Sequence, residues 1–383
     1  MYFRRVIYRT QKGNSALDNL KNLLFALALI WNFTSCKKEQ PNPQQPDTQL
    51  MLASPDSTIV AMDVSSLAMI LRKGVIFKNR EGKDVSIFDY LRKSGINTIR
   101  LRTWVGSDPN YNTDTIYKLA QLARKSKLLI WLDLHYSNTW ADPGNQKIPQ
   151  EWNSQDFELL KNDLSAYTRE LMSKFQPDFI QLGNEIDGGM LWPVGVISDT
   201  ANFYGLCREA VKQTRAVKPS TRIIFHISSY HNADWFFSHL NNHNIDYDIG
   251  GVSYYPKWHG NNLDSLFQTL NRVQNNTKKR MIIAENSYPF TFSWADWTDN
   301  VVGWDGDLHP NYPGTIDGQS NFVGEMMRRT YSLPFSSGYC YWEGVWVAFD
   351  GPESKQGSPW ENQACFDFSY KALPVISEFS KKD

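Results

Sequence analysis

The feature that most constrains the fold of this chain is a regular alternation of short apolar segments and amphipathic segments, which begins at Ile59. Short apolar runs bounded by turn residues are typical of buried parallel strands. The segments that we expect to form strands are Ile59–Asp63, Thr98–Trp104, Leu128–His135, Phe179–Asn184, Arg222–Ile227, Ile249–Tyr254, Arg280–Glu285 and Gly338–Trp342. Parallel strands need long crossover connections, and the amphipathic segments between them supply these.

The connecting segments carry apolar residues at helical spacing. The predicted helices are Ile87–Lys93, Thr115–Ser126, Phe157–Lys174, Phe203–Val217, Asp234–Asn241, Leu263–Gln274, Asn321–Tyr331 and Lys371–Phe379. Because strand and helix alternate without a change of composition, the sequence predicts one α/β domain folded as a closed (β/α)8 TIM barrel. No Gly-rich phosphate loop follows any predicted strand, so a dinucleotide-binding enzyme is not expected.

Length and charge agree with one large domain. The chain has 383 residues, and 41% of them are hydrophobic, whereas barrels of this class use about 250 residues or more. Lys and Arg total 40, as do Asp and Glu, so we expect no nucleic acid among the partners. Many of the 14 Trp stand beside polar residues in expected loops, where flat rings suit the apolar faces of sugars.

The N-terminal residues read as a leader and a linker. Basic residues precede an apolar stretch, Leu23–Phe33, which is too short for a stable transmembrane helix, and Thr34-Ser35 then precede Cys36. The pattern resembles a bacterial lipoprotein signal, residues 1–35, with Cys36 as the lipidated residue; an ordinary secretory signal with an incidental Cys is the alternative. Residues 36–56, rich in Pro, Gln and Asn, then form a flexible tether. We therefore expect a lipid-anchored protein of the bacterial cell envelope, at the outer membrane or cell surface, with its barrel in residues 57–383.

Three further cysteines are too few for a disulfide framework. Cys207 lies in a predicted helix and fits a small buried side chain. The sequence leaves open whether Cys340 and Cys365 are bridged.

Two glutamates stand at the C-terminal ends of their own predicted strands. Glu185 follows Gly183-Asn184, and Glu285 ends the run Met281–Ala284. Active sites of (β/α)8 barrels form at these strand ends. One carboxyl group that protonates the leaving oxygen and one that attacks the sugar are what a retaining glycoside hydrolase needs. The alternative is that each Glu pairs with an Arg for structural reasons.

Arg100, Arg102 and Trp104 occupy alternate positions of the second strand and so share one face. A barrel interior does not tolerate two cations without partners. A cation near Glu285 would keep that group ionised as a nucleophile, whereas Glu185 needs a raised pKa to donate a proton. A core ion pair is the structural alternative for Arg100.

Motifs on nearly every predicted strand resemble a known family. Gly95–Arg100, Asp133–Ser137, Gly183–Glu185, Ser253–Pro256 and Ala284-Glu285 look like the large clan of (β/α)8 glycosidases with catalytic Glu on strands 4 and 7. Within that clan, His135–Gly144, Leu191–Pro193 and Tyr341–Glu343 resemble glycoside hydrolase family 53, the endo-β-1,4-galactanases. The resemblance implies a retaining enzyme that acts on β-1,4-galactan or type I arabinogalactan. A related endo-glycanase on another β-linked polymer is one alternative, and a non-catalytic glycan-binding lipoprotein is another.

The resemblance also implies roles for individual residues. Glu185 is expected to be the acid/base and Glu285 the nucleophile, with Arg100 and Tyr255 positioning the nucleophile. Asn184 is expected to bind a sugar hydroxyl. The residues predicted to contact substrate are Arg100, Arg102, Trp104, His135, Asp142, Asn184, Trp192, His231, Tyr255, Trp342 and Trp346.

The loop Asp305–Asn311 places oxygen ligands at alternate positions, as loops that bind hard cations do. It resembles the calcium loop between strands 7 and 8 of bacterial galactanases. The resemblance implies side-chain ligands from Asp305, Asp307 and Asn311 and the backbone carbonyl of His309. We therefore expect one structural Ca²⁺; a solvated polar turn is the alternative.

Overall fold

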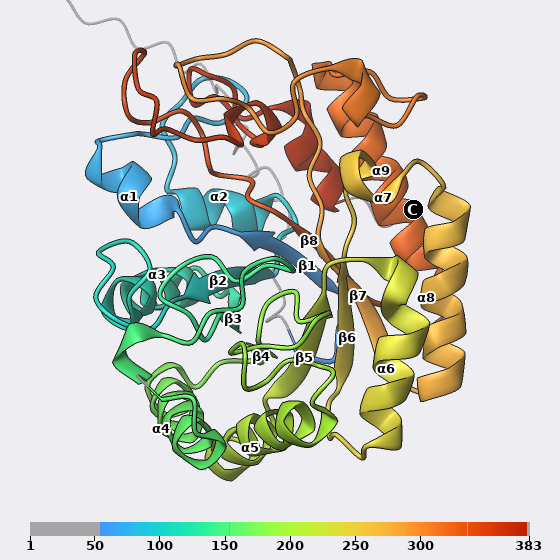
Figure 1. Ribbon diagram of the computed structural model, residues 1–383. Coiled ribbons are helices and arrows are strands. Elements are labelled where there is room, and N and C mark those ends of the chain that lie inside the picture. Colours follow the sequence, from blue (N-terminus) through green and yellow to red (C-terminus); the bar gives the residue numbers. More distant parts are fainter. Residues whose placement is uncertain (1–53, 153, 335, 381–383) are drawn as a thin grey trace, which may run out of the picture. The chain divides into compact units, whose positions relative to one another are not determined.

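Eight parallel strands close into a barrel in the computed structural model, which describes residues 54–152, 154–334 and 336–380 (Figure 1). Each strand pairs with the next, and β8 pairs with β1. The strands are β1 Ile59–Asp63, β2 Thr98–Thr103, β3 Leu129–Leu134, β4 Phe179–Leu182, β5 Arg222–Ile227, β6 Ile249–Ser253, β7 Arg280–Glu285 and β8 Ser336–Tyr341. The predicted (β/α)8 barrel is confirmed, and each predicted strand differs from the observed one by at most two residues at either end.

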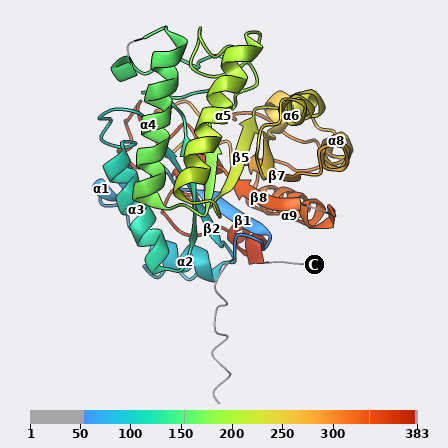
Figure 2. The same ribbon diagram turned by 90° about the horizontal axis from the view of Figure 1, so that it is seen from below.

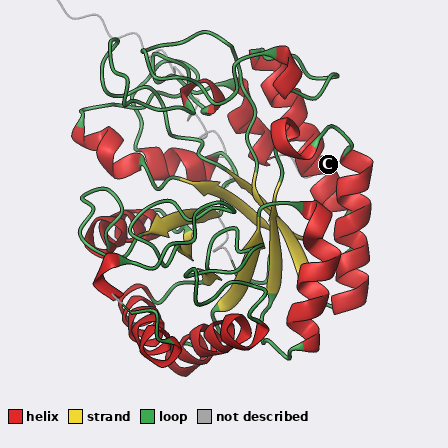
Figure 3. Cartoon of the chain, in the orientation of Figure 1, coloured by secondary structure: helices red, strands yellow, loops and turns green. Residues whose placement is uncertain are grey.

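Helices surround the barrel on its outside (Figures 2 and 3). They are α1 Leu67–Arg72, α2 Ile87–Lys93, α3 Thr113–Lys125, α4 Phe157–Phe175, α5 Thr200–Val217, α6 Ala233–Asn242, α7 Pro256–His259, α8 Leu263–Thr277 and α9 Ile316–Ser332. The 3-10 segments are η1 Gln150–Trp152, η2 Tyr230–Asn232, η3 Asp305–Asp307, η4 Glu361–Gln363 and η5 Pro374–Ser380.

The last predicted helix, Lys371–Phe379, is wrong over its first residues. The backbone N–H of Ala372 donates to the carbonyl of Lys78, and Lys371 forms a bridge with the same residue. This pairing holds the segment extended, and a 3-10 turn begins only at Pro374.

Polar side chains cap the N-termini of the longer helices. The Asp156 side chain accepts from the N–H of Leu159 at the start of α4, and the Thr315 side chain does the same for Gly318 in α9. Each such cap stabilises its helix by about 1 kcal/mol.

The interior of the barrel is apolar at one level and polar at the next. An inner cluster of alternate strand residues includes Ile59, Trp131, Ile224 and Ile282. Further along the same faces, toward the C-terminal strand ends, the inward positions become charged or polar: Asp63, Arg100, Asp133, Gln181, His226, Ser253 and Glu285. The apolar layer therefore supports a polar layer on which a site can be built.

The structure answers the open question about the cysteines, whereas the predictions for the N-terminal residues are not tested. In the described part of the chain Cys207, Cys340 and Cys365 are buried free thiols, so Cys340 and Cys365 are not bridged. The predicted leader, Cys36 and most of the tether lie outside the described residues, so their boundaries stay predictions. Within the residues described, no helix combines the length and apolarity needed to cross a membrane.

Candidate active site

A cavity of about 440 Å³ lies at the C-terminal ends of the strands. Both glutamates singled out in the sequence line it, one following β4 and the other ending β7. The full lining is His135, Trp140, Ala141, Asp142, Pro143, Asn184, Glu185, Ser228, Tyr255, Trp258, His259, Glu285, Trp342 and Trp360. The barrel thus gathers chemistry from distant parts of the sequence at the end where such folds place active sites.

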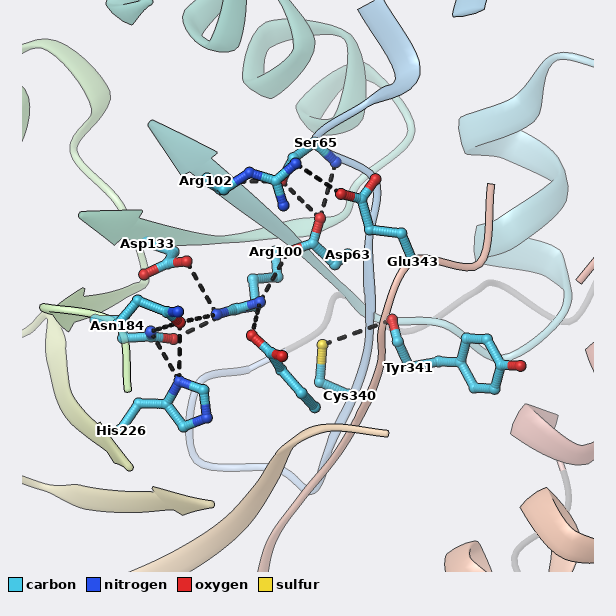
Figure 4. A network of polar contacts seen from close by, with 12 residues as sticks. Asp63, Ser65, Arg100, Arg102, Asp133, Asn184, His226, Cys340, Tyr341 and Glu343 are labelled. Carbon is cyan, nitrogen blue, oxygen red and sulfur yellow. Dashed lines mark hydrogen bonds and ion pairs between the residues drawn. The ribbon is translucent and has the colours of Figure 1, made fainter. Parts of the chain in front are cut away.

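Arg100 is the centre of a buried polar network beneath this cavity (Figure 4). Its guanidinium group contacts Asp63 Oδ2 at 3.0 Å, Asp133 Oδ2 at 2.9 Å, Glu285 Oε1 at 2.9 Å, Asn184 Oδ1 at 3.0 Å and Gln181 Oε1 at 3.2 Å. An arginine has five N–H donors in a rigid planar fork and can serve all these acceptors at once, whereas a lysine has three donors. Arg100 therefore orients Glu285 and Asn184 together.

Glu285 is held by two donors. Arg100 contacts its Oε1, and the Tyr255 hydroxyl donates to its Oε2 at 3.1 Å. Burial raises the pKa of Glu285 to about 7, and the Arg100 guanidinium opposes that rise. Within the glutamate pair, the carboxyl group beside a cation is the one that ionises first.

Glu185 has the opposite environment. Burial, and after it the charge of Glu285, raises the pKa of Glu185 well above its ordinary value. Ser253 donates a hydrogen bond to Oε1 of Glu185 at 2.7 Å and acts against this rise. The pair therefore keeps one proton near neutral pH, and that proton resides on Glu185.

The turn after β4 aims Glu185 into the cavity. Gly183 has a φ of 86° and Glu185 a φ of 47°, so the strand breaks sharply there. A Cβ at Gly183 would lie 2.7 Å from the side chain of Ile186, so any other residue there would force that side chain to shift. The side-chain amide of Asn184 donates to the backbone carbonyl of Ala141 at 2.8 Å. The backbone carbonyl of Asn184 accepts from the side-chain amide of Gln146 at 2.8 Å.

Four tryptophans that line the cavity, Trp140, Trp258, Trp342 and Trp360, form what we call the aromatic wall. Successive ring centroids lie 6.0 Å apart for Trp140 and Trp342, 4.7 Å for Trp342 and Trp360, and 6.5 Å for Trp360 and Trp258. Such a run of rings suits stacking against sugar faces.

Arg102 lies behind this wall. Its guanidinium carbon is 4.1 Å from the ring centroid of Trp140 and 4.6 Å from that of Tyr111, and Nη2 is 2.8 Å from Oε1 of Glu343. The side chain is fully buried. Contacts of this kind between a cation and ring faces fix the orientation of the rings.

The structure brings together seven of the predicted site residues in the cavity lining: His135, Asp142, Asn184, Glu185, Tyr255, Glu285 and Trp342. Arg100 lies directly beneath them. Arg102, Trp104 and Trp346 are buried behind the lining, while His231 packs on Tyr230. Trp192 lines a separate cavity of about 350 Å³. Substrate contact stays a prediction for all of these residues, and the last five also lie outside this lining.

Several residues that line the cavity are not among those predicted from the sequence. Trp258 and His259 follow the predicted strand-end residue Tyr255 within four positions, so their proximity could have been recognised. Trp140 lies within the motif that carried the family resemblance. Trp360 has no such signal, because it reaches the cavity from a long segment after β8.

The predicted calcium loop has other partners in this structure. Asp307 pairs with Lys257, whose Nζ is 3.0 Å from its Oδ2, and the carbonyl of His309 accepts from the Tyr288 hydroxyl and the N–H of Tyr312. Asp305 and Asn311 are exposed. Over the residues described, no three His, Cys, Asp or Glu side chains are grouped to hold a metal. The oxygens are of the right type, but Asp307 is paired with Lys257 in this arrangement; the calcium site stays a prediction.

The geometry supports acid/base and nucleophilic chemistry on a sugar. A carboxyl group that keeps its proton and a carboxylate held by a cation face one cavity with aromatic rings and an amide. That is the combination required for glycosidic bond cleavage.

Comparison with known proteins agrees with this chemistry. The family model described as "Glycosyl hydrolase family 53" matches residues 59–379. The chain is 27% identical over 418 residues to a protein of Bacillus subtilis (strain 168) named endo-beta-1,4-galactanase. The alignment covers 93% of this chain and 96% of that protein. It is 30% identical over 337 residues to the arabinogalactan endo-beta-1,4-galactanase of Humicola insolens. That alignment covers 84% of this chain and 98% of the Humicola insolens protein.

Solved structures extend the likeness to the fold. A family 53 catalytic domain of Ignisphaera aggregans superposes with a TM-score of 0.80 at 28% identity and covers 86% of this chain and 97% of that one. A structure from a study of two fungal beta-1,4-galactanases gives a TM-score of 0.75, also at 28% identity, with coverages of 85% and 99%. The family match over most of the barrel, together with the two glutamates at its strand ends, shows that this chain belongs to glycosyl hydrolase family 53.

Proposed function

We propose that this protein is an endo-β-1,4-galactanase that hydrolyses β-1,4-galactan and type I arabinogalactan with retention of anomeric configuration. The relatives named as galactanases match it over nearly their whole length. The single observation that carries the mechanism is the unequal environment of two carboxyl groups in one cavity, with Arg100 on Glu285 and Ser253 on Glu185.

In the first step, the carboxylate of Glu285 attacks the anomeric carbon of a galactosyl residue. Glu185 gives its proton to the glycosidic oxygen, the C1–O bond breaks, and the shortened galactan leaves with a free hydroxyl group. A galactosyl ester of Glu285 remains. Arg100 and Tyr255 hold the two oxygens of Glu285 in place for this attack.

In the second step, the ionised Glu185 takes a proton from water as the water oxygen attacks the same carbon. The ester bond to Glu285 breaks, its carboxylate is released, and the product leaves with the original β configuration. A retaining pair needs its carboxyl groups about 5 to 5.5 Å apart, because no water stands between nucleophile and sugar.

The aromatic wall and the polar residues beside it fit the substrate. Rings would cover the apolar face of successive galactosyl residues, while Asn184, Asp142 and His135 offer hydrogen-bonding groups to the hydroxyls. Burial lowers the pKa of His135, and Asp133 opposes this. A neutral imidazole suits a neutral polysaccharide.

Digestion of linear β-1,4-galactan beside mannan, xylan and cellulose tests the function. We expect galactan alone to be degraded, with oligosaccharides of mixed length early in the reaction and a β anomer as first product by proton NMR. The Glu285→Gln variant is the matched control for contaminating activity. Faster hydrolysis of another polymer, or release of single sugars from the start, would assign a different substrate or an exo-acting enzyme.

We also propose that the chain is a lipoprotein attached to the cell envelope through Cys36 and that the Asp305–Asn311 loop takes up Ca²⁺. The support for both is the sequence pattern alone. Calcium in this loop would compete with Lys257 for Asp307, since one carboxylate oxygen is paired with that ammonium group.

A further inference from the structure

A chain of hydrogen bonds leads from Glu185 into the barrel, away from the cavity. The Ser253 hydroxyl donates to Oε1 of Glu185 at 2.7 Å, and Nε2 of His226 lies 3.0 Å from the Ser253 oxygen. Ser253 and His226 are fully buried, on β6 and on the adjacent strand β5. Neither is among the residues that line the cavity.

The direction of this chain follows from counting hydrogens. A serine hydroxyl has one hydrogen, and with the Glu185 proton on Oε2 that hydrogen goes to Oε1 of Glu185. The Ser253 oxygen can then only accept from His226, which requires the hydrogen of the neutral imidazole to be on Nε2.

The other ring nitrogen is consistent with that assignment. Nδ1 of His226 lies 3.1 Å from the amide nitrogen of Gln181, a donor, and 3.0 Å from Oδ1 of Asn184. That Oδ1 already accepts from Arg100 and from Gln181, so both its lone pairs are used. Nδ1 is therefore the acceptor. In this assignment the two amide hydrogens of Gln181 go to Asn184 Oδ1 and His226 Nδ1, and none is left for the Gly183 carbonyl at 3.1 Å.

We propose that Ser253 and His226 are positioning residues that keep Oε1 of Glu185 as a hydrogen-bond acceptor and leave Oε2 to carry the catalytic proton. This inference rests on the acid/base role proposed for Glu185. Without the Ser253 hydroxyl, the proton can occupy either oxygen, and one of the two positions points away from the glycosidic bond. The hydrogen bonds from His226 to Ser253 and from Ser253 to Glu185 thus determine which oxygen of Glu185 delivers the proton.

Charged groups near these hydrogen bonds also shift the pKa values of Glu185 and His226, and they do so without the Ser253 hydroxyl. Glu285 and Asp187 raise the pKa of Glu185, and Arg100 lowers it. Burial holds the pKa of His226 well below its ordinary range; Arg100 and His135 lower it too, whereas Asp133 opposes them. His226 therefore stays neutral between pH 5 and pH 8, about the range in which a free histidine would titrate.

The first test is the pH dependence of kcat/KM in Ser253→Ala on a soluble β-1,4-galacto-oligosaccharide. The hydrogen bond from Ser253 stabilises the carboxylate form of Glu185, so its loss raises the pKa of Glu185. The basic limb of the pH profile of kcat/KM then moves to higher pH by about one unit. We expect kcat to fall about ten-fold with little change in KM, because productive protonation becomes less frequent.

Ser337→Ala is the matched control. Ser337 is also buried on a barrel strand, β8, and in the part of the chain described here its hydroxyl has no hydrogen-bond partner. Its variant should keep the wild-type profile. An active Ser253→Ala enzyme whose basic limb coincides with that of Ser337→Ala would overturn the inference while leaving the galactanase proposal intact. A wild-type protein without activity on galactan would instead overturn the proposed function.

The second test does not depend on turnover. In protein labelled with ¹⁵N at histidine, the His226 signals should show Nε2 protonated and Nδ1 unprotonated from pH 5 to pH 8. His226→Gln assigns these signals and retains a donor at the position of Nε2, so its basic limb should stay near that of the wild type. A hydrogen on Nδ1, or protonation of the ring within this range, would contradict the proposed direction of the chain.

Discussion

Nη1 of Arg100 lies 2.9 Å from Oε1 of Glu285 and holds the proposed nucleophile against the polar layer of the barrel. The same guanidinium group contacts Asp63 and Asp133, both fully buried. The sequence left two interpretations of Arg100 open, a core ion pair and a catalytic support. The structure unites them, because the carboxylates that make the arginine tolerable in the core also fix its position beside Glu285.

Arg100→Lys should lower kcat by about 100-fold or more, since one ammonium group cannot serve all the acceptors of the guanidinium fork. Arg100 opposes the rise in the pKa of Glu285, so weakening this contact raises that pKa. Because the nucleophile must be ionised, the acidic limb of kcat/KM should move to higher pH. Arg272→Lys, which alters an exposed pair with Asp234, is the control. An unchanged acidic limb would argue against electrostatic support by Arg100.

Trp140→Ala should raise KM for galacto-oligosaccharides about ten-fold, equivalent to about 1.4 kcal/mol, with a smaller effect on kcat. Its ring lines the cavity and rests on Arg102. Trp235→Ala removes an exposed ring on α6, outside the cavity, and should leave KM unchanged. Equal KM values for the two variants would exclude Trp140 from substrate binding.

Chelation should lower the melting temperature, and added Ca²⁺ should restore it, because a ligand that binds only the folded state stabilises that state. Asp307→Ala should remove the response. Lys257→Met should retain or strengthen it, since Lys257 competes for the same carboxylate. Purified protein that contains no metal and melts at the same temperature with and without chelator would refute the calcium proposal.

Cys36→Ala should move the protein from the membrane fraction to the soluble fraction and leave its activity unchanged, because the barrel begins after the tether. Fractionation of cells that express either form, followed by galactan digestion, measures both properties. Equal retention in the membrane fraction would rule out the anchor at Cys36.

The strands and both glutamates could be predicted because they depend on short-range patterns. A parallel strand buried on both faces is a continuous apolar run, and Glu185 and Glu285 stand where such runs end. Helices α1 and α7 have only six and four residues, too few for a helical period to be recognised.

The identity of the cavity-lining tryptophans could not be predicted in the same way. Trp104 and Trp140 both follow strand ends, but only the ring of Trp140 lines the cavity, while Trp104 packs edge-on against it at 5.6 Å. Which ring faces the substrate depends on the path of the loops and on Arg102 behind them. These are long-range contacts, which local patterns do not specify.

The most direct measurement of the central claim compares Glu185→Ala and Glu285→Ala on galactan and on an aryl β-galactobioside with an activated leaving group. We expect Glu185→Ala to lose activity on galactan but to keep turnover of the aryl substrate, which needs little protonation. Glu285→Ala should lose both activities and, with azide, should regain turnover of the aryl substrate with formation of the α-galactobiosyl azide. Equal loss of both substrates in the two variants, or an inverted product from the wild-type enzyme, would contradict the assignment of Glu185 as acid/base and Glu285 as nucleophile.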